Sequence, residues 1–148
     1  MEPDTDIITY WHPIKMDENY LMYLESVVDD KNGLEITISS EKKYNLKIVI
    51  NFEWYVAYRV TQENSMGKYW LKHKEIQWRN IFFIIKNSSW IAFICSVDEN
   101  CEWSQSSEWF QANKENLAEE LHYAIYTYDF FIEIISPTVP TISLHKIE

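Results

Sequence analysis

The chain has 148 residues, a length that suits one domain with a sizeable core. Hydrophobic residues make up 47% of it and aromatic residues 16%, which argues against a disordered chain. Only two glycines occur, Gly33 and Gly67, so glycine-rich phosphate loops and dinucleotide-binding fingerprints are excluded. The net charge of −10 disfavours nucleic-acid binding and favours encounter with a basic protein. The alternative explanation is that this charge only keeps the protein in solution.

Export and membrane insertion are not expected. The N-terminus is acidic, whereas a signal peptide needs positive charge followed by an apolar run. The most apolar region, residues 81–97, is interrupted by the polar run 86–89, so neither part is long enough to span a bilayer. Cys95 and Cys101 lack the spacing and the partners of a zinc site or a disulfide framework. These features predict a cytoplasmic protein with reduced thiols.

The first forty residues predict an arm, a helix and a strand. Residues 1–15 are expected to be extended, with Trp11 and Ile14 attached to the core. Residues 17–30 place apolar side chains at helical spacing behind Asp17, a suitable N-cap, so a short helix is expected and a strand is the alternative. Residues 31–33 are a turn signal, and residues 34–38 alternate as a strand.

Residues 44–61 carry a long strand pattern, around which the rest of the chain is organised. Every even position from Leu46 to Val60 is apolar or aromatic, whereas Lys47, Asn51 and Arg59 stand at odd positions. This period of two is typical of a strand with one buried face. The stretch exceeds the usual length of one strand, so a bend near residues 51–53 is expected to divide it.

The second half mixes helix and strand signals. Residues 62–77 predict a loop with at most one helical turn, and residues 78–86, apolar on both faces, predict a central strand. Ser88 or Ser89 is a candidate cap for a helix that ends at residue 96, with a hairpin strand as the alternative. Residues 113–121 are expected to be helical. Residues 122–127 and 131–135 predict a hairpin, and residues 138–144 a segment along a sheet edge.

These elements predict a single α+β domain over residues 1–148, with an extended N-terminal arm (1–15) and a C-terminal edge segment (137–148). The fold is expected to be an antiparallel-rich curved sheet of about five or six strands. Two or three short helices are expected on one side of this sheet.

Residues 98–121 concentrate the negative charge. Seven acidic side chains and one lysine give this segment a net charge of −6, and aromatic rings are interleaved among the acids. Carboxylates steer a basic partner and desolvated rings supply affinity, so the segment predicts a partner-binding surface. The alternative is that its tryptophans fold back onto the sheet. The predicted partner-binding residues are Glu102, Trp103, Glu108, Trp109, Phe110, Glu115, Glu119 and Glu120.

Catalytic and metal-binding motifs are absent from the sequence. It contains no Gly-x-Ser-x-Gly elbow, no metal-spaced histidine pair and no phosphate-binding loop, so neither a cofactor nor a metal is expected. A candidate polar site combines Arg59, Glu63 and His122. An Arg59–Glu63 ion pair and a packing or capping role for His122 are the structural alternatives.

Three segments of the chain are Asn-Phe-(x)₃-Val-Ala-Tyr-Arg-Val-Thr-Gln-Glu (51–63), Ser-Ser-Trp-Ile (88–91) and His-Tyr-Ala-Ile-Tyr-Thr…Ile-Glu-Ile-Ile (122–135). In this order they resemble small bacterial proteins of the polymorphic-toxin immunity type. The resemblance extends over residues 11–136 and includes no catalytic signature. It implies a cytoplasmic protein that binds and blocks a cognate toxin, often a basic nuclease.

The leading hypothesis is therefore a non-catalytic immunity protein that neutralises a basic toxin through the acidic aromatic segment. Two other classes remain open. One is a small-molecule-binding or enzymatic domain with a pocket on its sheet that uses Arg59, Glu63 and His122. The other is a structural subunit that buries its surplus aromatic residues in a homo-oligomer.

Overall fold

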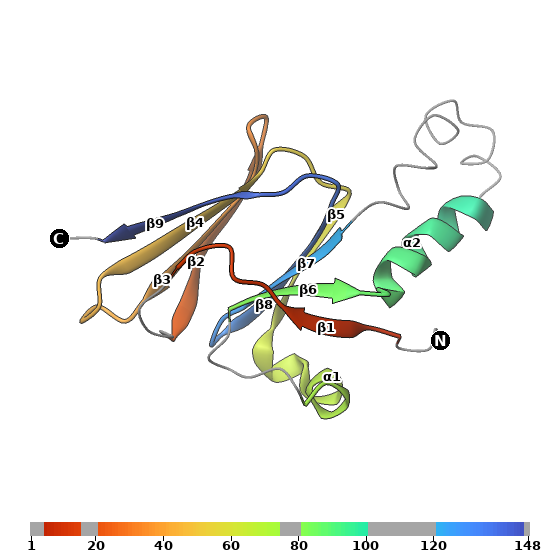
Figure 1. Cartoon of the computed structure of the whole chain (residues 1–148), viewed down its shortest axis with the longest axis horizontal. Coiled ribbons are helices and arrows are strands. Elements are labelled where there is room, and N and C mark those ends of the chain that lie inside the picture. The colour runs from red at the N-terminus through yellow and green to blue at the C-terminus, as the bar shows by residue number, and fades with distance from the viewer. Residues whose placement is uncertain (1–4, 16–20, 75–80, 101–120, 147–148) are drawn as a thin grey trace.

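A computed structural model describes residues 5–15, 21–74, 81–100 and 121–146, with residues 95–100 described by their backbone alone. In this part of the chain, nine strands form two sheets and every strand pair is antiparallel. Two short α-helices accompany them (Figure 1). The domain is therefore mostly antiparallel sheet.

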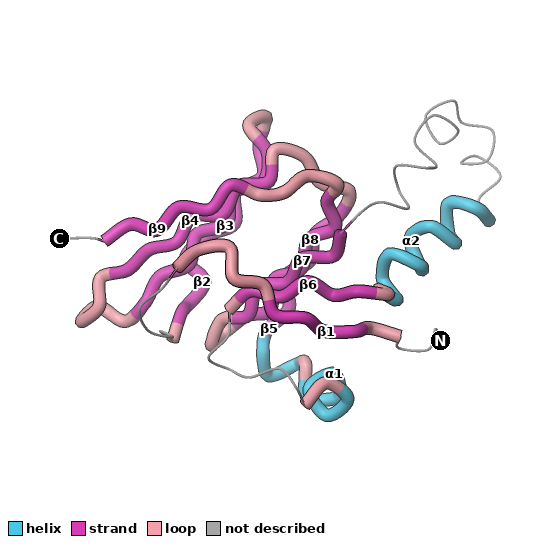
Figure 2. The backbone as a smooth tube through the Cα atoms, viewed as in Figure 1, coloured by secondary structure: helices cyan, strands magenta, loops and turns pink. Residues whose placement is uncertain are grey.

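Figure 2 shows the strands of the two sheets in magenta, and each strand belongs to one sheet. The four-stranded sheet has the order β2-β3-β4-β9 and the five-stranded sheet has the order β1-β6-β7-β8-β5. The strands of the first sheet are β2 (Met22–Asp30), β3 (Gly33–Ser40), β4 (Leu46–Phe52) and β9 (Thr141–Lys146). Those of the second are β1 (Ile7–Tyr10), β5 (Ala57–Gln62), β6 (Phe82–Lys86), β7 (Leu121–Tyr126) and β8 (Phe130–Ser136).

One apolar core lies between the sheets. The period-two pattern of β3 and β4 turns their isoleucines inward, where Ile36, Ile38 and Ile48 are fully buried. They share this core with side chains of β6, β7 and β8 from the other sheet. Phe52 of β4 meets Tyr123 of β7 edge-on, with ring centroids 5.3 Å apart. Burial of these side chains is the main force that holds the two sheets together.

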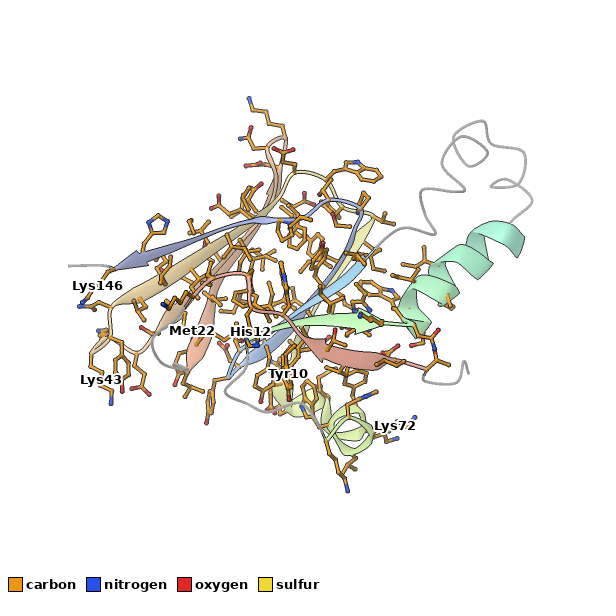
Figure 3. All side chains as sticks on the ribbon, in the orientation of Figure 1. Tyr10, His12, Met22, Lys43, Lys72 and Lys146 are labelled. Carbon is orange, nitrogen blue, oxygen red and sulfur yellow. The ribbon has the colours of Figure 1, made fainter. Side chains whose placement is uncertain are left out.

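The outer face of the five-stranded sheet carries the helices. Helix α1 (Gly67–Lys72) follows a 3₁₀ turn, η1 (Glu63–Ser65), and its Trp70 packs edge-on against Phe131 of β8. Helix α2 (Ser89–Asn100) begins directly after β6. In Figure 3, Lys72 of α1 projects away from the sheets, whereas Met22, only 2% exposed, lies between them. Both described helices pack on the outer face of the five-stranded sheet. Only α2 coincides with a predicted helix, and the predicted helix 113–121 lies outside the described residues except for Leu121.

The β2–β3 hairpin depends on Gly33. Its φ of +104° is a left-handed conformation that favours glycine. A Cβ atom at this position would lie 2.3 Å from the carbonyl oxygen of Phe52 on the neighbouring strand, so side chains are excluded on steric grounds as well. Asp30 closes the turn, because its carboxylate accepts the N–H of Asn32 at 2.8 Å.

Several predicted elements are confirmed. The long stretch is divided, as expected, into β4 and β5 by residues 53–56. Residues 82–86 lie inside a sheet with both neighbours paired, and the β7–β8 hairpin and the edge position of β9 also agree with prediction. The Ser88-capped segment is a helix and not the alternative strand, and it extends to Asn100.

Other predictions were wrong. Residues 22–30 form the strand β2, which had been the alternative, and not a helix. The described part of the expected arm is extended, and Trp11 and Ile14 pack against the core as predicted, but the arm also contributes an unforeseen strand, β1, which pairs with β6. The number of strands therefore exceeds the expected five or six, and there are two sheets in place of one.

Among the described residues, no helix is both long and apolar enough to cross a membrane.

Candidate functional site

A row of polar side chains crosses the outer face of the five-stranded sheet. Arg59 on β5 is directly opposite Glu133 on β8, and Glu133 is opposite Ala124 on β7. His122 precedes Ala124 by two residues and therefore projects from the same face of the sheet. Ser88 follows β6, the next strand along. Strand alternation and antiparallel register thus bring together four residues from four separate parts of the sequence.

Glu133 is the centre of this cluster and only 1% exposed. Its Oε2 accepts the Nε–H of Arg59 at 2.6 Å, and its Oε1 accepts from the Nη2 of Arg59 at 3.0 Å. The Nε2 of His122 lies 2.9 Å from the same Oε1. Burial alone raises the pKa of the Glu133 carboxyl, but the hydrogen bonds and charges of His122 and Arg59 outweigh it and leave the pKa below its ordinary value. Glu133 is therefore held as a carboxylate.

His122 is fully buried and links Glu133 to Ser88. Its Nδ1 lies 2.7 Å from the hydroxyl oxygen of Ser88, which also accepts the N–H of Ile91 at 3.1 Å. Because Glu133 is a carboxylate and can only accept, the Nε2 of His122 carries the proton of that hydrogen bond. The Nδ1 forms the second hydrogen bond, to the Ser88 hydroxyl. This assignment gives every ring nitrogen and carboxylate oxygen in the cluster a partner.

Trp90, in the first turn of α2, covers the cluster. The guanidinium carbon of Arg59 lies 4.1 Å from the centre of the indole ring. The same ring meets the His122 imidazole at 70°, with centroids 5.3 Å apart. Stacking of this kind favours a cation over the aromatic face and keeps water from the hydrogen bonds beneath it. Trp90 thereby fastens the start of α2 to the sheet.

The order serine, histidine, carboxylate is that of a nucleophile-activating triad. The geometry differs from such a site in one respect that matters for chemistry. The Ser88 hydroxyl is the N-cap of α2 and is turned inward, and the residue is only 8% exposed, whereas a nucleophile must reach its substrate. The arrangement fixes α2 on the sheet by a closed hydrogen-bond network.

No family model, curated protein or solved structure matches this chain. Among the described residues, no group of three or more histidine, cysteine, aspartate or glutamate side chains is placed to hold a metal ion.

The candidate polar site of the sequence is brought together in part. Arg59 and His122 both contact Glu133, which sequence reasoning missed. Glu63 is absent from this cluster, and the ion-pair partner of Arg59 is Glu133. Glu63 begins η1 and lines a separate pocket with Tyr128. The signal that could have identified Glu133 is a single charge within the apolar strand of residues 130–135.

The predicted partner-binding residues lie outside the described part of the chain. They are Glu102, Trp103, Glu108, Trp109, Phe110, Glu115, Glu119 and Glu120. Their connectivity is nevertheless defined, because β6 ends at Lys86, β7 begins at Leu121, and these two strands are paired neighbours. The acidic aromatic segment therefore belongs to one long connection between adjacent strands.

Proposed function

We propose that this chain is a non-catalytic protein-binding module, an immunity protein that neutralises a basic bacterial toxin. In this proposal the acidic aromatic segment, residues 98–121, occupies the cationic site of the toxin. Two supports come from separate sources. One is the composition of the segment, and the other is how the fold holds its two ends.

The observation that carries the proposal is a hydrogen bond that holds the start of the 87–120 connection to the strand β7 that follows it. Two paired antiparallel strands need only a short turn, whereas this connection holds the helix α2 and then the acidic aromatic segment. Connecting segments held on a rigid scaffold are where binding residues are concentrated. Here the Ser88–His122 hydrogen bond, 2.7 Å long and buried, ties the beginning of the connection to its end. The most acidic part of the chain is thus an insertion on a rigid sheet, a common arrangement for binding loops.

The closed polar cluster supports binding over catalysis. Glu133, His122 and Ser88 use their polar atoms on one another, on Arg59 and on the Ile91 N–H, which leaves the serine hydroxyl engaged as a helix cap. The residues that would be candidates for acid–base chemistry instead anchor α2. Anchoring fixes the start of α2 on the sheet before any partner binds, which reduces the ordering cost of binding and improves affinity.

The proposed mechanism has two steps. The net charge of −6 over residues 98–121 attracts a cationic surface and accelerates encounter. The interleaved aromatic residues Trp103, Trp109 and Phe110 then exclude water from the contact and supply most of the affinity. The same negative charge repels nucleic acid. If the toxin is a nuclease, its nucleic-acid substrate therefore does not bind to this chain.

Co-expression tests the proposal. The chain is expressed together with a basic toxin domain, beginning with any that its neighbouring genes encode, and growth is measured. We expect the wild-type chain to restore growth and the triple variant E115K/E119K/E120K to protect less. The control E35K/E41K/E53K makes the same change in net charge at exposed positions outside the segment and should protect fully. A toxin that kills equally with and without the wild-type chain would refute the proposal.

A further inference from the structure

A pocket separate from the polar cluster opens at the other end of the five-stranded sheet. It has a volume of about 400 Å³, and Leu21, Glu63, Tyr126 and Tyr128 line it. A shallower pocket of about 340 Å³ adjoins it and shares Glu63 and Tyr128. The first volume lies within the range of small-molecule sites, about 300–1,000 Å³.

The hairpin between β7 and β8 makes one wall rigid. The N–H of Tyr128 donates to the carbonyl of Met22 at 2.8 Å. The Asp129 carboxylate accepts the N–H of Leu24 at 3.0 Å, and its backbone carbonyl accepts the N–H of Glu63 at 3.0 Å. These bonds join three separate segments at the pocket, so its shape exists before any ligand binds.

Among the described residues, the lining combines aromatic rings with the carboxylate of Glu63. Tyr126 is half-buried and Tyr128 is 60% exposed, so both present apolar ring surface to the pocket. Among the described residues, no lysine, arginine or histidine lies within 4.0 Å of the Glu63 carboxylate. Burial raises the pKa of the Tyr126 phenol first, and the negative charge of Glu63 and its hydrogen bonding to the phenol raise this pKa further, so the carboxylate lies close to the ring.

We propose that this pocket binds a small organic cation, an ammonium group carried on an aromatic or branched apolar body. The ammonium group pairs with Glu63 and lies against the electron-rich faces of Tyr126 and Tyr128. The apolar body displaces water from the side of Leu21. Neutral and anionic molecules of the same shape lose the attraction to Glu63 and are rejected.

A small molecule fits this site better than a basic side chain of a protein partner. A single lysine or arginine side chain would leave much of the 400 Å³ unfilled. The pocket also lies at the far end of β7 from Leu121, where the acidic aromatic segment enters the sheet. The inference is thus independent of the proposed toxin-neutralising function.

Binding is tested with three matched probes on the full chain at low salt: phenethylammonium, the neutral 2-phenylethanol and the anionic phenylacetate. Chemical shifts of backbone amides report where each probe binds, and titration gives its Kd. We expect phenethylammonium to move the amides of residues 21–24, 61–65 and 126–129 in a saturable way. The E63Q variant should bind it about tenfold more weakly or worse. The matched control E35Q removes an exposed charge from β3 and should bind like the wild type.

Three results would overturn the inference. One is equal affinity for phenethylammonium and 2-phenylethanol, which would mean that Glu63 contributes nothing. Another is that both E63Q and Y128A, which removes an exposed ring, bind phenethylammonium with the wild-type affinity. The third is saturable binding at these amides by a lysine-rich peptide alone, with no response to phenethylammonium, which would assign the pocket to a protein partner.

Discussion

Replacement of Glu133 by glutamine tests whether the buried cluster holds α2 and the long connection to the sheet. The substitution keeps the shape of the side chain and removes its charge. Glutamine can still accept one hydrogen bond through its carbonyl oxygen. Its NH₂ group must then face an N–H of Arg59 or of His122, which places two donors against each other.

The expected loss is about 3 kcal/mol of unfolding free energy. Loss of one partner from a buried ion pair costs about 3–5 kcal/mol, because the remaining charge stays desolvated. The Arg59 side chain is 46% exposed and can turn to water, which reduces the cost toward the lower limit. For a chain of 148 residues, a loss of this size lowers the Tm by about 10 °C.

Urea unfolding followed by tryptophan fluorescence measures the loss at pH 7. The control E35Q makes the same chemical change on the exposed face of β3 and should stay within about 0.5 kcal/mol of the wild type. If the unfolding free energy of E133Q is less than about 1 kcal/mol below that of the wild type, the cluster does not anchor α2 to the sheet.

Two further predictions follow from the fold. The pKa of Glu133 is lower in the folded chain than its unfolded value of about 4.3, so its contribution to stability is complete above that pH and disappears as the pH falls through the folded pKa. The difference in unfolding free energy between wild type and E133Q should therefore shrink below about pH 4, and a constant difference down to pH 3 would contradict this account. Alanine at Gly33 should lower the free energy of unfolding by about 2–3 kcal/mol, because φ is positive there and the new Cβ would lie 2.3 Å from the carbonyl oxygen of Phe52. Alanine at Gly67, which has open space around it, should stabilise the folded chain by about 0.4–1 kcal/mol. Equal effects of the two substitutions in thermal unfolding would refute the steric argument.

The strands that could be predicted are those with an uninterrupted pattern. In β3 and β4 large apolar side chains recur at every second position, Leu34 to Ile38 and Ile48 to Phe52, and all of them are buried. The Lys31-Asn32-Gly33 signal worked because only glycine tolerates the conformation required at its last position. Such features are local, so the sequence contains them in full.

The wrong prediction for residues 22–30 has a cause outside the segment itself. A β-bulge between Leu24 and Ser26 adds one residue to the strand. Met22, Leu24 and Val27 all face the core, but the bulge changes their spacing from two to three. That spacing imitates one face of a helix. The bulge depends on pairing with β3, which no local pattern reveals.

The site was only partly predictable because its residues meet through register. Arg59 opposes Glu133 only if β5 pairs with β8 at one particular offset, and Ser88 reaches His122 only across the β6–β7 pair. Glu63 stands four residues after Arg59, which suggested an ion pair. The chain turns into η1 at Glu63 and carries its side chain away from the cluster.

The most direct test of the central proposal is the rate of association between this chain and a basic toxin domain against which it protects in co-expression. Stopped-flow fluorescence measures the rate at ionic strengths from about 0.05 to 0.5 M. If residues 98–121 steer the encounter, the wild-type rate falls steeply with salt, and E115K/E119K/E120K associates about tenfold more slowly at low salt with a flatter dependence. An unchanged rate and an unchanged salt dependence in that variant would contradict the proposal.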